Sequence, residues 1–414
     1  MTSVHCLLFF VIILSRSSSE ILEVKLLLKF ILFSQKHRSS IGSVPTHGPR
    51  GSQTITFHSS AEDLVTLSLI PAATSFAPFS ETRLRGMSQL IGNTPLLEIH
   101  LLYKGQFRSI FAKYEAMNLT GSIKDRMVFE IFQQAYVDGT LKPGYTIVEA
   151  TSGNTGISCA AIGRALGHSV KIFMPDWMSR ERVLLIQSLG AEVVLVTRER
   201  GGFLGSIALC EQLASERDDI FLPRQFSNRA NLQAHFTGTG PEIWLQLDAC
   251  GRRPDAFVAG VGTGGTVMGT GVYLREKNPN VKIHPVEPLE SPTLSTGHKV
   301  GSHRIQGISD DFIPAIVDLS AVDEVLSISD GDSIIMAQKI ASELGLGVGI
   351  SSGCNLLAAI HAQEQLGPSA TVVTVFCDDN KKYLTTALLQ REPVKPEYLS
   401  SDVSLVAVHS HSRC

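Results

Sequence analysis

The sequence predicts an α/β protein with two lobes, in which twisted and mostly parallel sheets are flanked by helices. The chain has 414 residues and is 43% hydrophobic, which is enough for a large buried core. From Met87 onward, short apolar runs alternate with helical patterns, as in proteins built from βα units. Loops rich in glycine and small hydroxyl residues follow several of these runs, where ligands bind in such folds.

The first 86 residues are expected to form a poorly structured extension. Residues 6–14 are apolar like the core of a signal peptide, but no Lys or Arg precedes them. The apolar run 25–33 is too short to span a bilayer, so no membrane span is expected. Residues 34–60 contain no acids and many serines, as in organellar transit peptides. Secretory, organellar and non-structural interpretations of this extension therefore all stay open.

A first set of alternating elements lies between residues 145 and 196. Apolar runs predict strands, and amphipathic patterns predict helices, in the order 145–150, 157–167, 169–175, 179–190 and 191–196. Gly167 stands where a helix C-cap would be. A second set comprises a strand and loop at 255–265, a helix to about Lys277, and strands at 281–287 and 371–376. Both sets predict parallel sheets.

Charge and cysteine usage exclude several classes of function. A net charge of −3 and a sequence pI of 6.5 provide no basic face for nucleic acid. The seven cysteines are scattered, without a C-x-x-C pair or a histidine cluster of metal-binding spacing, so we expect no metal site. Unpaired cysteines suit a reducing compartment. We expect a cytoplasmic protein, with mitochondrial or plastid targeting by the extension as the alternative.

Two glycine-bearing loops are candidate anion sites. In "GVGTGGT", residues 260–266, backbone N–H groups and the start of the next helix would cradle a phosphate. The same loop fits G-x-G-x-x-G, and Glu287 lies 22 residues after Gly265, so a nicotinamide dehydrogenase is an alternative. In "TSGNTG", residues 151–156, hydroxyl and amide groups suit a carboxylate, and Asn154 would reach a second ligand oxygen.

Lys124 begins a predicted helix that runs to about Val137. The positive end of the helix dipole favours a neutral amine there, as a lysine that forms a Schiff base requires. A solvated surface lysine is the simpler interpretation of this residue alone. Together, however, an imine-forming lysine, a phosphate loop and a carboxylate loop indicate a site for pyridoxal phosphate that carries an amino acid.

From residue 87 to about 391 the chain resembles the cysteine synthase and cystathionine β-synthase family of fold-type II pyridoxal-phosphate enzymes. The matching motifs, in the family's order, are LIGNTPLLEI (90–99), GSIKDR (121–126), EATSGNTGI (149–157), MPDWMSRER (174–182), QFSNRAN (225–231), GTGPEIW (238–244), GVGTGGTVMG (260–269), IQGISDDFIP (305–314) and GISSG (349–353). No haem-like Cys/His pattern precedes Met87, and only about 23 residues follow Arg391, so the resemblance is closest to a cysteine synthase-like protein.

The resemblance implies a role for each matching residue. Lys124 would bind the cofactor covalently and move the Cα proton, and Ser351 would hydrogen-bond the pyridine nitrogen. Asn154 would contact the ring oxygen. The remaining positions would grip the phosphate (Gly262, Thr263, Gly264, Gly265 and Thr266) or bind the substrate carboxylate (Thr151, Ser152, Gly153, Thr155 and Gln225).

The resemblance also implies a division of the chain and a partner. The large cofactor-binding lobe would comprise residues 87–121 and 226–391, and the small mobile substrate lobe residues 122–225. Residues 392–414 would be a C-terminal tail. Members of the family are commonly homodimers, so we expect a homodimer.

The implied activity is β-replacement at Cβ of O-acetylserine, serine or cysteine through an aminoacrylate, with sulfide or a thiol as the second substrate. One alternative is a lyase that releases sulfide from cysteine by elimination or lanthionine-type chemistry. An alternative of another class is a catalytically weak metabolite sensor that acts through a partner protein.

Cys377 and an acidic pair, Asp378 and Asp379, follow the closing strand where cysteine synthases typically carry a proline and small or hydroxyl residues. We expect a turn and helix cap here, with Lys381 and Lys382 at a solvated helix start. The alternative hypothesis is that one of the two acids lies near the pyridine nitrogen and favours its protonated form.

Overall fold

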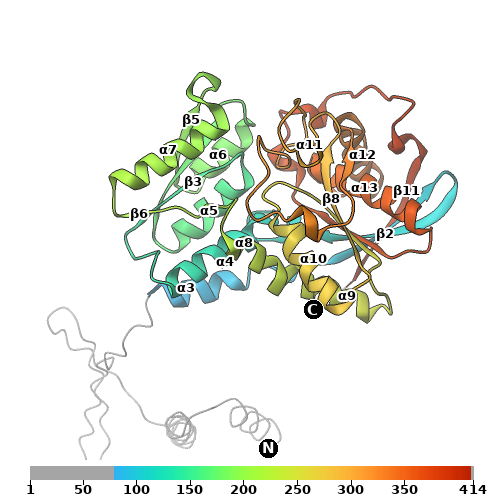
Figure 1. Cartoon of the computed structure of the whole chain (residues 1–414), viewed down its shortest axis with the longest axis horizontal. Coiled ribbons are helices and arrows are strands. Elements are labelled where there is room, and N and C mark those ends of the chain that lie inside the picture. Colours follow the sequence, from blue (N-terminus) through green and yellow to red (C-terminus); the bar gives the residue numbers. More distant parts are fainter. Residues whose placement is uncertain (1–78, 412–414) are drawn as a thin grey trace, which may run out of the picture. The chain divides into compact units, whose positions relative to one another are not determined.

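Residues 79–411 are described by a computed structural model of the chain, and they form two sheets with helices packed on both faces (Figure 1). The signal-like and transit-like segments predicted within residues 1–60 lie outside the described residues. No helix in residues 79–411 is long and apolar enough to cross a bilayer.

The larger sheet has seven strands in the order β11-β1-β2-β10-β7-β8-β9. The strands are β1 (Leu96–Tyr103), β2 (Gln106–Tyr114), β7 (Ala256–Gly260), β8 (Lys282–Pro288), β9 (Leu326–Ile328), β10 (Val372–Phe376) and β11 (Val403–His411). β1 pairs antiparallel with β2 and β11, and the other four pairs are parallel.

The smaller sheet has four parallel strands in the order β5-β4-β3-β6. They are β3 (Thr146–Ala150), β4 (Ser169–Pro175), β5 (Glu192–Val196) and β6 (Ile220–Phe221). The longer helices are α3 (Phe79–Ser88), α4 (Lys124–Val137), α5 (Asn154–Ala165), α6 (Arg180–Ser188), α7 (Gly202–Glu216), α8 (Arg229–Ala234), α9 (Gly240–Ala249), α10 (Gly265–Lys277), α12 (Asp330–Leu344) and α13 (Ile350–Leu366).

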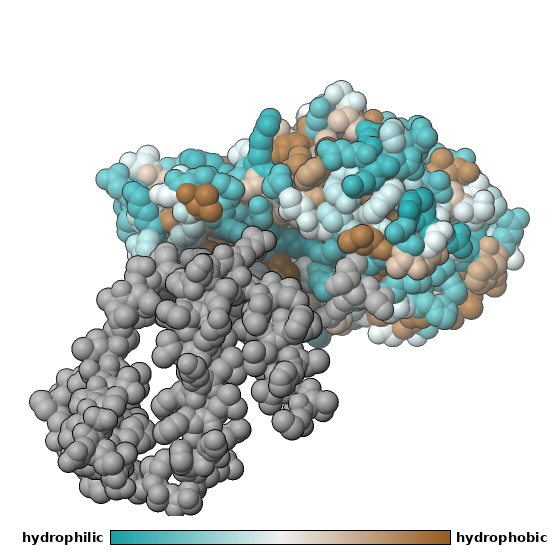
Figure 2. Space-filling view, turned by 90° about the horizontal axis from the view of Figure 1, so that it is seen from below, coloured by the Kyte–Doolittle hydropathy of each residue, from teal (hydrophilic) through white to brown (hydrophobic). Residues whose placement is uncertain are grey.

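Alternation along the parallel strands fills hydrophobic clusters on opposite faces of each sheet. In β7, Ala256 and Val258 pack with α12 and α13, whereas Phe257 and Ala259 pack with α9 and α10. The small sheet has the same construction, with α4, α5 and α6 on one face and α7 on the other. Because both faces are covered, these strands are continuous apolar runs. Where Figure 2 shows described residues, the surface is mainly hydrophilic with scattered hydrophobic side chains.

The predicted alternation of strands and helices is confirmed. The strands expected at 145–150, 169–175 and 191–196 are β3, β4 and β5, and the helices between them are α5 and α6. The helix expected from Lys124 to about Val137 is α4, and the closing strand is β10. The fold class is therefore as predicted, because apolar periodicity determines both kinds of element.

The described structure differs from the expected domain division at both ends. Within the expected extension, residues from Phe79 onward form α3, and Leu84 and Met87 pack on the small-lobe core. Within the expected tail, β11 pairs with the whole length of β1. Val403 and Leu405 of β11 are buried, because the strand covers an edge that β1 would otherwise leave unpaired.

A buried ion-pair network fixes α4 to the large lobe. Arg126 binds Glu115 through Nε at 2.6 Å and Glu242 through Nη1 at 2.7 Å, and Lys113 Nζ lies 2.7 Å from Glu242. Burial opposes ionisation of Glu242, but the hydrogen bonds and charge of Arg126 outweigh it and lower the pKa of Glu242 to about 2. The network therefore sets the position of the residue two places earlier, Lys124.

We predict that Glu115→Gln destabilises the protein by about 3 kcal/mol, because it leaves a buried guanidinium short of one counter-charge. Urea-induced unfolding measures the change. The matched control is Glu211→Gln, which removes the partner of Arg224 from a surface pair and is expected to change the free energy of unfolding by less than about 1 kcal/mol. Equal losses in the two variants would contradict the importance of the buried network.

Candidate active site

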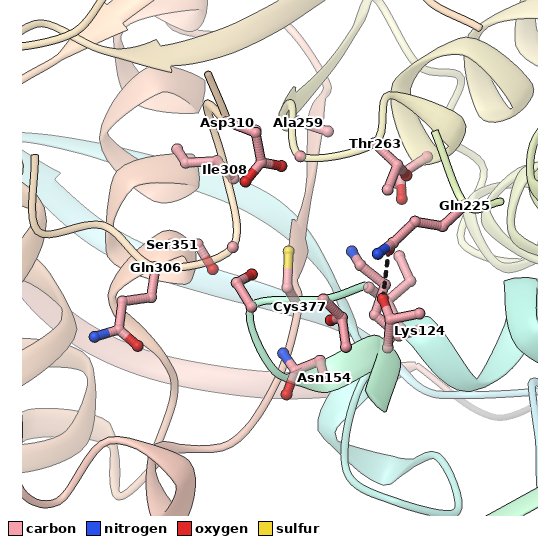
Figure 3. A pocket seen from close by; sticks show the side chains of 18 of the residues that line it. Lys124, Asn154, Gln225, Ala259, Thr263, Gln306, Ile308, Asp310, Ser351 and Cys377 are labelled. Atoms are coloured by element: carbon pink, nitrogen blue, oxygen red, sulfur yellow. Dashed lines mark hydrogen bonds between the residues drawn. The ribbon is translucent and has the colours of Figure 1, made fainter. Parts of the chain in front are cut away.

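A pocket lies beyond the carboxyl ends of β3, β7 and β10 (Figure 3). Of the residues singled out in the sequence, it is lined by Lys124, Thr151, Ser152, Asn154, Thr155, Gln225, Gly262, Thr263, Thr266 and Ser351. Gly153, Gly264 and Gly265 do not line it. The pocket adjoins a wider cleft, which is lined by loops that connect the strands of both sheets. Ser152 and Gln306 line both the pocket and the cleft.

Lys124 is the first residue of α4 and lines the pocket. The backbone places it there, because the N–H of Ile123 donates to the carbonyl of Cys377 at 2.9 Å and ties the start of α4 to the end of β10. Asp125 holds α4 to α5 by accepting hydrogen bonds of 2.6 Å from Ser158 and Thr120. Within residues 79–411, no carboxylate forms an ion pair with the Lys124 amine.

The glycine-rich loop joins β7 to α10 and forms one wall of the pocket. Gly264 adopts a φ of +88°, which favours glycine. A Cβ on Gly262 would overlap the carbonyl oxygen of Gly307, and one on Gly265 would overlap the Asn231 amide. The side chain of Asn231 in turn donates to Thr263 Oγ1 at 2.8 Å. Close packing thus leaves backbone N–H groups at the start of α10 as the surface of this wall.

The loop at 151–155 and Gln225 form a second wall, and Gln225 adjoins the glycine-rich loop through Asn231. The 151–155 loop and Gln225 come together because β3 and β6 are neighbouring strands, and both segments follow their carboxyl ends. Thr155 Oγ1 donates to Gln225 Oε1 at 2.7 Å, and Gln225 Nε2 donates to the carbonyl of Ala150 at 2.7 Å. Gly153 is turned away from the pocket and lies against Arg182, where a Cβ would overlap the arginine side chain.

Glu149 supports this wall from beneath, which the sequence analysis did not predict. Its carboxyl accepts from the N–H groups of Ala150 at 2.9 Å and Gln225 at 3.2 Å. Burial raises the pKa of Glu149 to about 7. The only signal in the sequence was an acid inside an otherwise apolar strand.

Ser351 and Cys377 lie at the far side of the pocket. Ser351 is the second residue of α13, and Figure 3 shows Cys377 near the middle of the pocket, between Ser351 and Lys124. Burial raises the pKa of the Cys377 thiol to about 12, so the group remains neutral. Sequence reasoning noted Cys377 only as a departure from the family's proline.

Asp310 is a second carboxyl that the sequence analysis missed. It lines the pocket from the loop at 305–314. Desolvation raises its pKa to about 7, and the charge of Asp311 adds to the effect, although the Lys124 amine opposes both. The signal available in the sequence was an adjacent pair of acids, Asp310 and Asp311, within one of the family-like motifs.

The two acidic residues after β10 have different roles. Asp379 accepts from the N–H of Lys381 at 3.0 Å, as the expected cap would. Asp378 is buried and accepts from Asn154 Nδ2 at 2.6 Å, not from the Ser351 side of the pocket. The expectation of solvated lysines is wrong for Lys382, which is buried because its ammonium donates to the carbonyl of Gly121 at 2.7 Å.

Glu287 does not reach the pocket. Its carboxylate accepts from the N–H of Leu294 at 2.7 Å and binds Ser295, so it caps the short helix α11 (Thr293–Thr296). The residue that would hold a ribose in a nicotinamide dehydrogenase is therefore already occupied. No group of three or more acidic, His or Cys side chains placed to hold a metal occurs in residues 79–411.

Comparisons with known proteins identify the family. The family model described as "Pyridoxal-phosphate dependent enzyme" matches residues 87–378. A probable cysteine synthase of Bacillus subtilis (strain 168) is 41% identical over 301 residues, which cover 73% of this chain and 96% of that protein. A cysteine synthase of Staphylococcus aureus (strain Mu50) is 39% identical over 302 residues, with the same coverage of 73% and 96%.

A solved structure is more similar still. The crystal structure of a hydrogen sulfide-producing enzyme from Fusobacterium nucleatum is 54% identical and superposes with a TM-score of 0.77, covering 79% of this chain and 97% of that chain. Because sequence and fold agree over most of the described residues, the chain belongs to the family of pyridoxal-phosphate dependent enzymes, as a two-lobed fold-type II member.

Proposed function

We propose that this protein is a pyridoxal-phosphate enzyme that exchanges the substituent on Cβ of a serine-derived amino acid or cysteine. One observation carries the proposal: a single pocket brings together an amine without a carboxylate partner, a glycine-rich anion cradle and a loop suited to a carboxylate. The relatives named cysteine synthase support the reaction class.

The residues present fit the cofactor. The loop of Gly262, Thr263, Gly264, Gly265 and Thr266 is the cradle that would hold the phosphate, because it leads into the N-terminal turn of α10 and three of its residues line the pocket, Gly262, Thr263 and Thr266. Ser351 would bind the ring nitrogen and Asn154 the ring oxygen, and Lys124 would form the covalent link. When bound, the cofactor draws electrons away from Cα of the attached amino acid.

The chain's own groups would then hold the substrate and move protons. Thr151, Ser152, Thr155 and Gln225, which line the pocket, would bind the carboxylate through hydroxyl, amide and N–H donors, whereas Gly153 lies behind them. The Lys124 amine takes the Cα proton, the bond from Cβ to the leaving group breaks, and a sulfide, thiol or water forms the new bond to Cβ. The same amine returns the proton to Cα. Closure of the small lobe over the pocket would keep competing water away.

Release of sulfide from cysteine is the direction that the pocket favours. The structure with 54% identity is named a hydrogen sulfide-producing enzyme. In addition, Asp310 has a pKa of about 7, so near neutral pH it can give or take the proton of a leaving sulfide or an incoming nucleophile. The homodimer and the cytoplasmic compartment stay predictions.

Product analysis tests the proposal. The purified protein is incubated with cysteine, serine, O-acetylserine and O-phosphoserine, each with and without sulfide, and the products are identified. Sulfide formed from cysteine supports the favoured direction, and cysteine formed only from O-acetylserine or O-phosphoserine supports biosynthesis. A colourless protein that stays colourless with added pyridoxal phosphate and yields no product would contradict the proposal and favour a metabolite sensor.

We predict that Lys124→Ala loses the visible absorbance of the covalently bound cofactor and lowers turnover by at least about a thousandfold, since the variant lacks both the covalent link and the proton carrier at Cα. Absorbance spectra and steady-state rates measure the two effects. The exposed lysine variant Lys142→Ala is expected to match the unmodified protein. Retained visible absorbance in Lys124→Ala would assign the link to another lysine.

We predict that sulfide release from cysteine changes with pH through the titration of Asp310, which is protonated below and ionised above a pH of about 7. Asp310→Asn should remove this step of the profile of kcat/KM and lower the rate by about a hundredfold. Asp311→Asn should keep the step but move it to lower pH, because the charge of Asp311 helps to raise the pKa of Asp310. An unchanged profile in Asp310→Asn would exclude it as a proton carrier.

A further inference from the structure

Asp378 is buried between the two sheets, directly after β10. It is 1% exposed, and its Oδ2 accepts hydrogen bonds from Asn154 Nδ2 at 2.6 Å and from the hydroxyl of Tyr383. Asn154 is the first residue of α5 in the small lobe, whereas Asp378 and Tyr383 follow the central strand of the large lobe. One carboxylate therefore joins the two lobes at the wall of the pocket.

The contact determines which way the amide of Asn154 points. An ionised carboxylate only accepts hydrogen bonds, so it can face the NH₂ end of an amide and not the carbonyl end. One N–H of the Asn154 amide donates to Asp378. Because the amide is planar, this hydrogen bond also fixes the direction of the second N–H on the same nitrogen. The Asn154 Oδ1 is buried without a hydrogen-bond partner among the described residues. Asp378 and, at 3.5 Å, the Tyr383 hydroxyl therefore receive the donor end of the amide, and this orients the side chain of Asn154.

The other side of the same carboxylate lies against the start of α13. A Cβ on Gly349, the N-cap of this helix, would overlap Asp378 Oδ1, and the Gly349 N–H donates to the Asp378 carbonyl at 3.2 Å. A carboxylate near a helix N-terminus is favoured by the helix dipole. Ser351, the expected partner of the ring nitrogen, lies two residues after Gly349.

We propose that Asp378 is a positioning residue, which orients the Asn154 amide and seats the first turn of α13, so that Asn154 and Ser351 would be placed to meet the ring oxygen and the ring nitrogen of the cofactor. The inference rests on the proposed function, because the roles of Asn154 and Ser351 belong to it. Asp378 itself does not line the pocket, so it acts through these neighbours.

A tyrosine and an arginine complete the arrangement. The Arg182 guanidinium lies 5.2 Å from the centroid of the Tyr383 ring, and its Nη1 donates to the carbonyl of Ser152 at 2.6 Å. Tyr383 therefore connects the carboxylate of Asp378 to the positive charge beneath the substrate loop. Burial raises the pKa of the Asp378 carboxyl, while the charge of Lys382 and the hydrogen bonds from Tyr383 and Asn154 oppose the rise.

The neighbouring acid supplies a matched control. Asp379 follows Asp378 directly but turns the other way: it caps the turn at Lys381 and lies 3.5 Å from Lys382. It contacts neither Asn154 nor Gly349 in the described structure. Asp378→Asn and Asp379→Asn each remove one carboxylate, at neighbouring positions. Only Asp378→Asn removes the carboxylate that the Asn154 amide binds.

The experiment compares these variants by cofactor titration of the apo-protein and by the visible spectrum of the holoenzyme. In Asp378→Asn we expect the affinity for pyridoxal phosphate to fall by about tenfold, the value of one charge-assisted hydrogen bond, and the visible band and its pH midpoint to shift. Asp379→Asn should leave both unchanged. In the Asn154→Ala background, Asp378→Asn should cause a severalfold smaller loss, because the amide that it orients is absent.

The outcomes are distinguishable. Unchanged affinity and spectrum in Asp378→Asn, an equal shift in Asp379→Asn, or the full tenfold loss in the Asn154→Ala background would each overturn the proposal. If Asp378→Asn does not fold, Tyr383→Phe replaces it: the variant removes one donor and should shift the band in the same direction, and an unshifted band overturns the proposal. Failure of the unmodified protein to bind pyridoxal phosphate would instead overturn the proposed function.

Discussion

The buried ion-pair network of Arg126 with Glu115 and Glu242 is the constraint on which the rest of the site depends. The buried charges of Arg126, Glu115 and Glu242 are tolerated because each edge of the guanidinium binds a carboxylate. The ammonium of Lys113 also neutralises Glu242. The network joins β2, α4 and α9. Lys124 stands two residues before Arg126, so the position of the proposed reacting amine follows from this network and not from contacts of the amine itself.

Parallel strands then bring the remaining groups to the same place. The loops after β3, β7 and β10 all leave the sheets at their carboxyl ends, and α5, α10 and α13 present their N-terminal turns toward the pocket. Three positive helix ends around one cavity suit a ligand with a phosphate and a carboxylate. The pKa values of Glu149 and Asp310 are raised to about 7 in spite of these helix ends, because both carboxyls are desolvated and neither forms an ion pair among the described residues.

The lobes are linked by polar contacts as well as by the chain. Ser179 Oγ donates to the carbonyl of Lys382 at 2.8 Å, and Glu181 accepts from the N–H of Thr385 at 2.7 Å. The pair of Asp378 and Asn154 adds a third contact of this kind. These contacts are compatible with a small lobe that moves on ligand binding, and they would define its resting position.

The sequence by itself determined the fold class, the strand and helix order, and the loops that carry the site, because apolar periodicity and glycine placement are local properties of the chain. Lys124, Asn154 and Thr263 lie in segments that were singled out this way, and all three line the pocket. Only the tertiary structure decided the role of Glu149, Asp310 and Asp378, and the burial of Lys382. Acids and lysines are solvated by default, and whether one is buried depends on partners far along the chain: Asn154 is 224 residues from Asp378. Such pairings arise from strand order, which no local pattern encodes.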